Sequence, residues 1–177
     1  VDGLGQPVQS MNAKGEIRSF LNGKSFGYTA GEAKEAYAPR LRQFTRHVMY
    51  IRPNLYVLFD DLECDQPRNY SWLFHSYQPL QIDQPNHRLF LDANTATLDM
   101  LLWSSSALTY SQTDQFAVPL DEPMNKPVQW HLTATTKEKQ NKAYFLAVLA
   151  PAPKGQQRQF KSTLLTTTAG EGVLVEE

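Results

Sequence analysis

Hydrophobic and polar residues alternate along much of this chain, most clearly between Leu41 and Tyr77. Such a period of two indicates extended backbone, because successive side chains of a strand point to opposite faces. The Pro53-Asn54 pair predicts a turn, since proline lacks a backbone donor and fixes φ. We therefore predict three consecutive strands of one antiparallel sheet over residues 41–52, 55–62 and 70–77. The middle strand is apolar on both faces until Asp60, which is typical of one layer of a sandwich.

The remaining chain carries the same pattern, broken at short intervals by proline, glycine and asparagine. Further strands are predicted over residues 7–9, 16–21, 26–29, 80–82, 87–92, 95–103, 108–110, 128–136, 143–150, 160–168 and 173–175. The helix-forming segment 31–37 is stopped by Pro39, so we expect only a turn or a short 3₁₀ piece there. Residues 112–127 have three prolines and no period, which predicts a long loop at the rim.

These elements predict an all-β fold, a two-layer antiparallel β-sandwich with about ten to thirteen short strands and little helix. One domain over residues 1–177 is expected, because a chain of 177 residues can bury a substantial core without dividing. The core should contain the apolar residues of the strands that are hydrophobic on both faces, namely Leu55, Val57, Phe59, Leu73, Tyr144, Leu146 and Val148.

Charge excludes two classes of partner. The formal net charge is −1 at pH 7, so we expect neither a nucleic-acid partner nor a membrane partner. No apolar run approaches the roughly 20 residues that span a bilayer. The charge is uneven, however: residues 14–52 hold eight Lys or Arg against three Glu, and residues 53–125 hold two Arg against ten acids. A basic edge beside an acidic one is therefore one interpretation, and an ordinary solvated surface is the other.

The candidates for acid, base or metal chemistry are few. The single Cys64 excludes an internal disulfide, and the Cys and His residues lack the spacing of a zinc site, so no metal ligand and no cofactor are assigned. His47, His75 and His131 each alternate with apolar residues, so each can face a groove or can be satisfied locally. His75 is kept as a substrate-binding candidate. Asp60-Asp61 suits a general base or a metal, and equally the end of a strand. No nucleophile motif is present, which leaves a hydrolase of a familiar nucleophilic type unsupported, and no catalytic residue is assigned.

Four arginines separated by even numbers of positions are the stronger signal, at positions 40, 42, 46 and 52. On one interpretation they share a face and bind carboxylate or sulfate through paired hydrogen bonds, with Arg42 and Arg46 as substrate-binding residues. On the other they pair with the acids of residues 60–65. The pattern leaves both open. The three tryptophans, Trp72, Trp103 and Trp130, each lie in an apolar strand, which favours a core position over stacking on sugar rings.

Three segments of residues 1–77 resemble a known family in their order. They are Val1-Asp2-Gly3-Leu4-Gly5-Gln6, then the Gly31-to-Tyr37 segment GEAKEAY, and then Phe44-Thr-Arg46 through Arg52-Pro53 and Phe59-Asp60-Asp61-Leu62 to Trp72-Leu-Phe-His75. Together they resemble the carboxy-terminal β-sandwich of the heparinase II/III-like polysaccharide lyases. Beyond residue 77 only the β-rich character agrees.

The resemblance implies a function and a location. In that family a helical toroid precedes the sandwich, an acidic polysaccharide lies between them, and a Tyr/His constellation removes the proton beside a uronic acid carboxylate in a β-elimination. The family's catalytic and zinc-binding histidines are expected upstream of Val1, so this chain is expected to be a portion of a longer secreted bacterial protein, inactive alone. Zinc is expected only in that longer protein, which is expected in the periplasm or outside the cell. Glycosaminoglycan and alginate are the expected substrate classes.

One alternative function stays open at this stage. The chain is either a supporting domain that braces the cleft of a lyase, with its arginine-rich face or the 112–127 loop near the substrate, or a carbohydrate-binding or purely structural module docked on a catalytic neighbour. A binding module retains its affinity for sugar when isolated, whereas a bracing domain does not.

Overall fold

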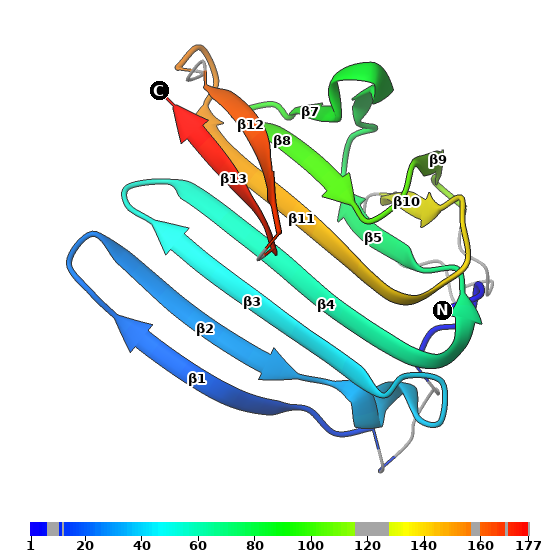
Figure 1. Ribbon diagram of the computed structural model, residues 1–177. Coiled ribbons are helices and arrows are strands. Elements are labelled where there is room, and N and C mark those ends of the chain that lie inside the picture. The colour runs from blue at the N-terminus through cyan, green and yellow to red at the C-terminus, as the bar shows by residue number, and fades with distance from the viewer. Residues whose placement is uncertain (7–10, 12, 116–127, 157–159, 169, 177) are drawn as a thin grey trace.

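The computed structural model describes residues 1–6, 11, 13–115, 128–156, 160–168 and 170–176, and this part of the chain is almost entirely β-structure (Figure 1). Two 3₁₀ segments, η1 (Lys34–Tyr37) and η2 (Gln84–Asn86), are its helical elements. None of the described helical segments has the length or the apolar character to cross a membrane. The strands are β1 (Glu16–Asn22), β2 (Phe26–Glu32), β3 (Gln43–Ile51), β4 (Leu55–Arg68), β5 (Ser71–Ser76), β6 (Gln81–Asp83), β7 (Arg88–Asp92), β8 (Ala96–Ser104), β9 (Leu108–Thr113), β10 (Trp130–Thr136), β11 (Gln140–Pro153), β12 (Lys161–Thr167) and β13 (Gly170–Glu176).

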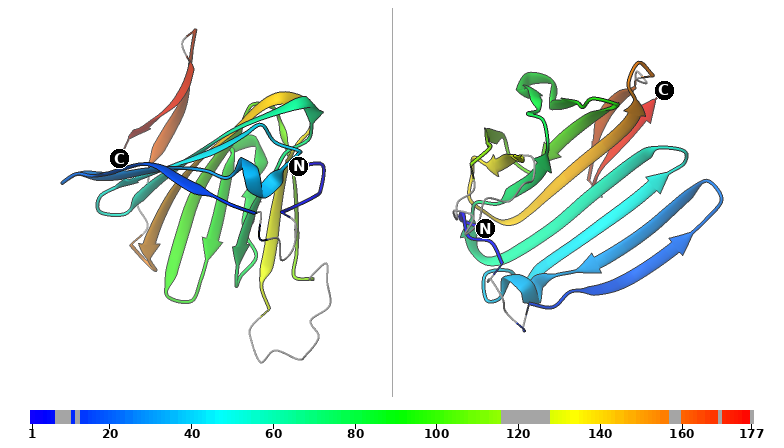
Figure 2. Two further views of the ribbon diagram at one scale, coloured as in Figure 1. Left: turned by 90° about the horizontal axis from the view of Figure 1, so that it is seen from below. Right: turned by 180° about the vertical axis from the view of Figure 1, so that it is seen from behind.

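The strands form one large sheet and two small ones, all antiparallel. The large sheet has eight strands in the order β1-β2-β3-β4-β11-β8-β7-β6, and a three-stranded sheet follows the order β5-β10-β9. Strands β12 and β13 form a separate hairpin. The two views of Figure 2 show the large sheet curving strongly, with the hairpin projecting from it. The predicted antiparallel all-β sandwich is therefore confirmed.

Strands β4 and β11 form the centre of the large sheet because both are apolar on their two faces. They pair from Leu62↔Ala143 to Tyr56↔Leu149, so each face of the pair needs a covering layer. The prediction that residues 70–77 continue the same sheet was wrong. Strand β4 runs on to Arg68 and already has β3 and β11 as neighbours, so β5 joins β10 in the second sheet instead.

The two faces of the large sheet are covered by different elements. One face packs on the three-stranded sheet through Phe145, Met100 and Leu102, which meet Trp72, Leu132 and Ala134 in one buried cluster. The opposite face carries a second cluster of Leu101, Trp103, Leu146 and Val148, against which the β12–β13 hairpin packs Leu164 and Val173. A central sheet with both faces covered explains why β11 and β8 contain runs of consecutive buried residues.

The predicted core is confirmed in part. Leu146 and Val148 are buried, and four other predicted core residues pack half-buried against them: Leu55, Val57, Phe59 and Tyr144. The prediction that Leu73 belongs to the core was wrong, because this residue is 60% exposed on the outer face of β5, opposite the buried Trp72. Trp103 is also buried, whereas Trp130 is only half-buried.

The turn signals fare better than the strand boundaries. Turns lie at Asn22-Gly23, Pro53-Asn54 and Ala93-Asn94, and η1 falls inside the predicted 31–37 segment. The predicted loop 112–127 begins too early, since β9 continues to Thr113. The rest of that loop, residues 116–127, lies outside the described residues, as does the short strand predicted at 7–9.

Glu32 at the end of β2 ties three elements together. Its carboxylate accepts hydrogen bonds from the backbone N–H groups of Lys34 (2.8 Å) and Phe44 (2.9 Å) and from the Thr45 hydroxyl (3.2 Å). Burial opposes ionisation of this carboxyl, but the hydrogen bonds outweigh burial and lower its pKa below the ordinary value of 4.5. The bonds therefore stabilise the ionised form, and with it the junction of β2, η1 and β3.

We expect Glu32→Gln to flatten the acid side of the stability profile. A carboxyl with a lowered folded-state pKa contributes stability above pH 4.5 that is lost as the pH falls through its folded-state pKa. Urea midpoints measured from pH 6 down to pH 3 should consequently fall less steeply in Glu32→Gln than in the unmodified chain. Glu35→Gln is the matched control, and parallel profiles for Glu32→Gln and the unmodified chain would contradict the assignment.

Candidate functional site

A cavity of about 380 Å³ opens between the edge of the three-stranded sheet and the large sheet. Strand β5 is an edge strand of the smaller sheet, so the face of β3 and β4 beside it is only partly covered. The cavity has Arg46 and Asp60 on the large sheet, Tyr37 from η1 and Trp72 from β5 in its wall. Segments far apart in sequence thus combine a charged pair with aromatic rings.

Arg46 and Asp60 form a two-point ion pair at the wall of this cavity. They lie opposite each other in the β3–β4 register. Arg46 Nε donates to Asp60 Oδ1 at 2.6 Å, and Nη2 donates to Oδ2 at 2.7 Å. The Asp60 side chain is 3% exposed, whereas that of Arg46 is 44% exposed. The hydrogen bonds to Asp60 raise the pKa of Arg46, so the guanidinium stays charged.

This geometry prepares Arg46 to bind an anion. A guanidinium has five N–H donors, and the pairing with Asp60 uses two of them. The remaining donors belong to a group whose orientation is fixed by a buried carboxylate, which reduces the entropy lost when it binds a carboxylate or a sulfate.

Aromatic rings complete the cavity wall. The Tyr37 and Phe44 rings meet edge to face at 5.3 Å, and the Arg46 guanidinium lies 5.7 Å from the centre of the Phe44 ring. Trp72 and Phe74 stack nearly parallel at 5.9 Å on β5. An arginine beside an aromatic ring, in a wall that also contains Tyr37 and Trp72, suits a ligand that has both an acidic group and apolar C–H surface, as an acidic sugar does.

The four arginines do not act as one surface. Arg46 pairs with Asp60 and Arg42 with Asp65, as the second interpretation of the sequence predicted, and binding of a ligand by Arg42 and Arg46 stays a prediction. Arg42 lies outside the cavity wall, in an ion pair whose side chains are 67% and 59% exposed. Arg52 lies just beyond the far end of β3, where it donates a hydrogen bond to the side chain of Asn22.

His75 lies away from the cavity wall, on the outer face of the three-stranded sheet. It is paired in register with His131 of β10, and their rings stack 4.5 Å apart. The structure therefore leaves His75 outside the cavity wall, although Ser71 and Leu73 of the same strand border the cavity. Within the described residues, no three His, Cys, Asp or Glu side chains gather as a metal site would require.

One polar pair was missed by the sequence analysis. The Tyr28 hydroxyl lies 2.7 Å from Nδ1 of His47, on the face of the large sheet opposite Arg46. Part of this arrangement could have been predicted from the sequence. The Asn22-Gly23 turn predicts the β1–β2 hairpin, and alternation places His47 on the face of β3 opposite that of Arg46. Only the β2–β3 register brings Tyr28 beside it, however.

No protein-family model matches this sequence, and comparison with curated proteins finds no relative. Solved structures do match. A heparinase III gene product superposes with a TM-score of 0.70 at 8% identity, over 93% of this chain and 28% of that protein. Heparan sulfate lyase HepC from Pedobacter heparinus gives 0.64 at 12%, over 92% and 28%, and another heparinase III gives 0.65 at 13%, over 91% and 27%.

These similarities establish the fold. The chain has the fold of one part of heparinase III and heparan sulfate lyase, in agreement with the resemblance that its motifs carry. It spans about 28% of the length of those proteins.

Proposed function

We propose that this chain is a non-catalytic supporting domain of a polysaccharide lyase that cleaves a uronic-acid-containing polysaccharide by β-elimination. The observation that carries the proposal is the Arg46–Asp60 pair in a cavity with aromatic residues in its wall, on a fold found within heparinase III and heparan sulfate lyase. The longer protein that this implies would place a helical domain and its catalytic groups beside the sandwich, and would act in the periplasm or outside the cell.

The chemistry of the cavity supports a binding role over a catalytic one. Elimination needs a base at the proton beside the carboxylate, an acid at the leaving oxygen and a group that neutralises the carboxylate. Arg46 meets the last requirement. The cavity wall formed by the described residues contains no histidine. Of its two tyrosines, Tyr37 packs its ring edge to face on Phe44, and Tyr70 uses its hydroxyl to bond the backbone carbonyls of Gln140 and Asn141. Burial also raises the pKa of Tyr70, so its hydroxyl stays protonated and cannot take up the proton.

We expect the chain to form no unsaturated product from heparan sulfate. Because the Arg46 cavity is lined by this chain's own described residues, we also expect the chain to bind heparan sulfate oligosaccharide weakly when isolated, unlike a domain that only braces the cleft. Arg46→Lys keeps a charge beside Asp60 but loses the planar two-point geometry. Loss of one hydrogen bond to a charged group is worth about 1.5–3 kcal/mol, so affinity measured by calorimetry should fall roughly ten-fold or more. Arg18→Lys is the matched control, because Arg18 forms an exposed ion pair with Glu16 on β1.

Two results would count against the proposal. Growth of the ultraviolet absorbance of a conjugated uronate, with heparan sulfate and the chain alone, would show that the domain is catalytic. Equal affinities of the Arg46→Lys and Arg18→Lys variants would separate the cavity from sugar binding and favour a purely structural module.

A further inference from the structure

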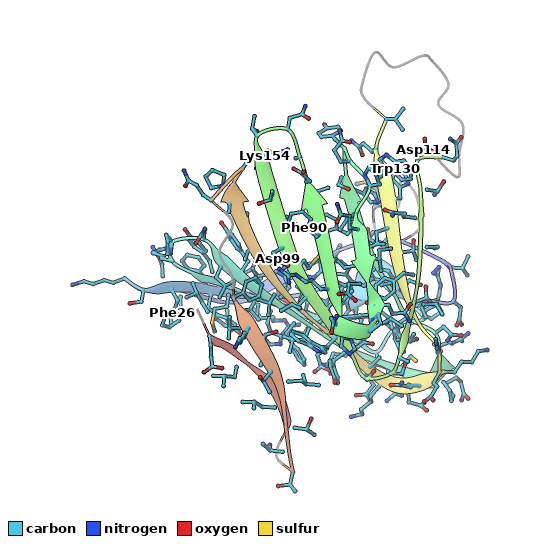
Figure 3. All side chains as sticks on the ribbon, turned by 90° about the horizontal axis from the view of Figure 1, so that it is seen from above. Phe26, Phe90, Asp99, Asp114, Trp130 and Lys154 are labelled. Atoms are coloured by element: carbon cyan, nitrogen blue, oxygen red, sulfur yellow. The ribbon has the colours of Figure 1, made fainter. Side chains whose placement is uncertain are left out.

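A second groove lies on the opposite face of the large sheet, under the β12–β13 hairpin. It has a volume of about 580 Å³ and runs between β12 and the strands β7 and β8. Asp99 of β8, labelled in Figure 3, lies in its wall. The β4–β11–β8 register puts Asp99 and Asp60 on opposite faces of the sheet, so this groove and the Arg46 cavity are separate sites.

The groove repeats the charged arrangement of the first cavity. Arg88 Nε donates to Asp99 Oδ1 at 2.8 Å, and Arg88 Nη2 donates to the other carboxylate oxygen. Asp99 is buried, with 9% of its side chain exposed, while the Arg88 side chain is 48% exposed. A buried carboxylate thus fixes a half-exposed guanidinium whose remaining donors are available to a ligand.

The other lining residues suit an anionic sugar. Lys161 at the start of β12 adds a second permanent positive charge, against the single carboxylate of Asp99 among the lining residues. Trp103 and Phe160 supply aromatic surface, and the exposed His87 ring lies 6.2 Å from Trp103. Hydroxyl groups come from Ser162 and Thr163. Positive charge, aromatic surface and neutral hydrogen-bonding groups together match the acidic group, the C–H face and the hydroxyls of a charged saccharide.

We propose that this groove is a second saccharide-binding site, which takes a sulfated or carboxylated oligosaccharide through Arg88 and Lys161. The proposal rests on the proposed function for the class of sugar, and on the charge of the groove for its location. A chain of sugars bound here would contact the domain on the side away from the Arg46 cavity, so the domain would hold a polysaccharide at two separate places.

The two sites can be tested separately, because each contains one tryptophan. Trp72 lines the Arg46 cavity and Trp103 lines the groove. The indole N–H signals of the chain, assigned with Trp72→Phe and Trp103→Phe, are followed by NMR during titration with a heparin tetrasaccharide. Separate titrations use sodium sulfate, a neutral tetrasaccharide and a short DNA duplex. We expect the Trp103 signal to shift with the heparin tetrasaccharide, at least ten-fold more weakly with sulfate, and not with the neutral sugar.

Variants identify the contacts. Lys161→Gln should weaken the Trp103 response at least three-fold, and Arg88→Gln at least ten-fold, while Arg18→Gln should leave it unchanged. Lys161 is exposed, so its variant is informative even if Arg88→Gln, which leaves Asp99 unpaired, unfolds the chain. The second site would be overturned if the Trp103 signal does not shift with the heparin tetrasaccharide, or if Lys161→Gln leaves that shift unchanged. A shift with sulfate, neutral sugar or DNA as strong as that with the heparin tetrasaccharide would also overturn it. A shift of the Trp72 signal alone would overturn the second site while leaving the proposed function intact. A shift of the Trp103 signal alone would support binding in the groove and count against binding in the Arg46 cavity.

Discussion

Replacing Phe145 by alanine is expected to lower the free energy of unfolding by about 3–5 kcal/mol, as is typical of a large aromatic residue removed from a core. Phe145 is 2% exposed on β11 and belongs to the cluster between the large sheet and the three-stranded sheet. Its neighbours are held by two sheets, so the space it leaves cannot close completely. Urea unfolding, followed by tryptophan fluorescence, measures the change.

Phe20→Ala provides the matched control for this prediction. Phe20 is 76% exposed on the edge strand β1, and its removal should change stability by less than about 0.5 kcal/mol. Phe59→Ala should fall between them, because Phe59 is only half-buried in the opposite cluster. Equal losses for Phe145→Ala and Phe20→Ala would mean that the two sheets do not pack as one core.

The sequence predicts the strands well and their partners less well, for a physical reason. Alternation reports on a strand and its two faces, and turn residues such as Pro53 report on its ends. Neither reports on which strand lies beside it. Residues 41–77 look like one continuous meander. The strand that rules this out is distant in the sequence, because β11 takes the place beside β4 that β5 would need. The misplaced Leu73 follows from the same error.

The candidate site shows a similar division. The pairing of Arg42 and Arg46 with acids of residues 60–65 was one of two interpretations of the sequence, and the β3–β4 hairpin makes it a local feature. The cavity itself needs Trp72 and Tyr37, which only the folded chain brings beside Arg46. The sequence did not identify Arg88 as a candidate binding residue, because a single arginine on a short strand forms no recognisable motif. Only the folded chain brings Asp99 and β12 beside it.

We expect Arg46→Met to destabilise the chain by about 3–5 kcal/mol, more than Asp60→Asn does, although the two residues form one ion pair. The side chains are unequally exposed, at 44% for Arg46 and 3% for Asp60. Loss of the arginine leaves a buried carboxylate without its counter-charge, which is the costly way to break such a pair. Loss of the carboxylate leaves a guanidinium that water can still reach, so about 1–3 kcal/mol is expected for Asp60→Asn.

A double replacement tests whether this cost comes from the unpaired charge. Buried ion pairs replaced by apolar residues of similar volume are often neutral in stability, so Arg46→Met with Asp60→Leu should be more stable than Arg46→Met alone. Their difference in urea unfolding should be at least about 1 kcal/mol, since residues in direct contact are strongly coupled. If Arg46→Met costs under 1 kcal/mol, water reaches Asp60 and the pair does not fix the guanidinium. If the double variant keeps the fold but loses heparan sulfate binding, the pair is retained for its ligand and not for the stability of the sandwich.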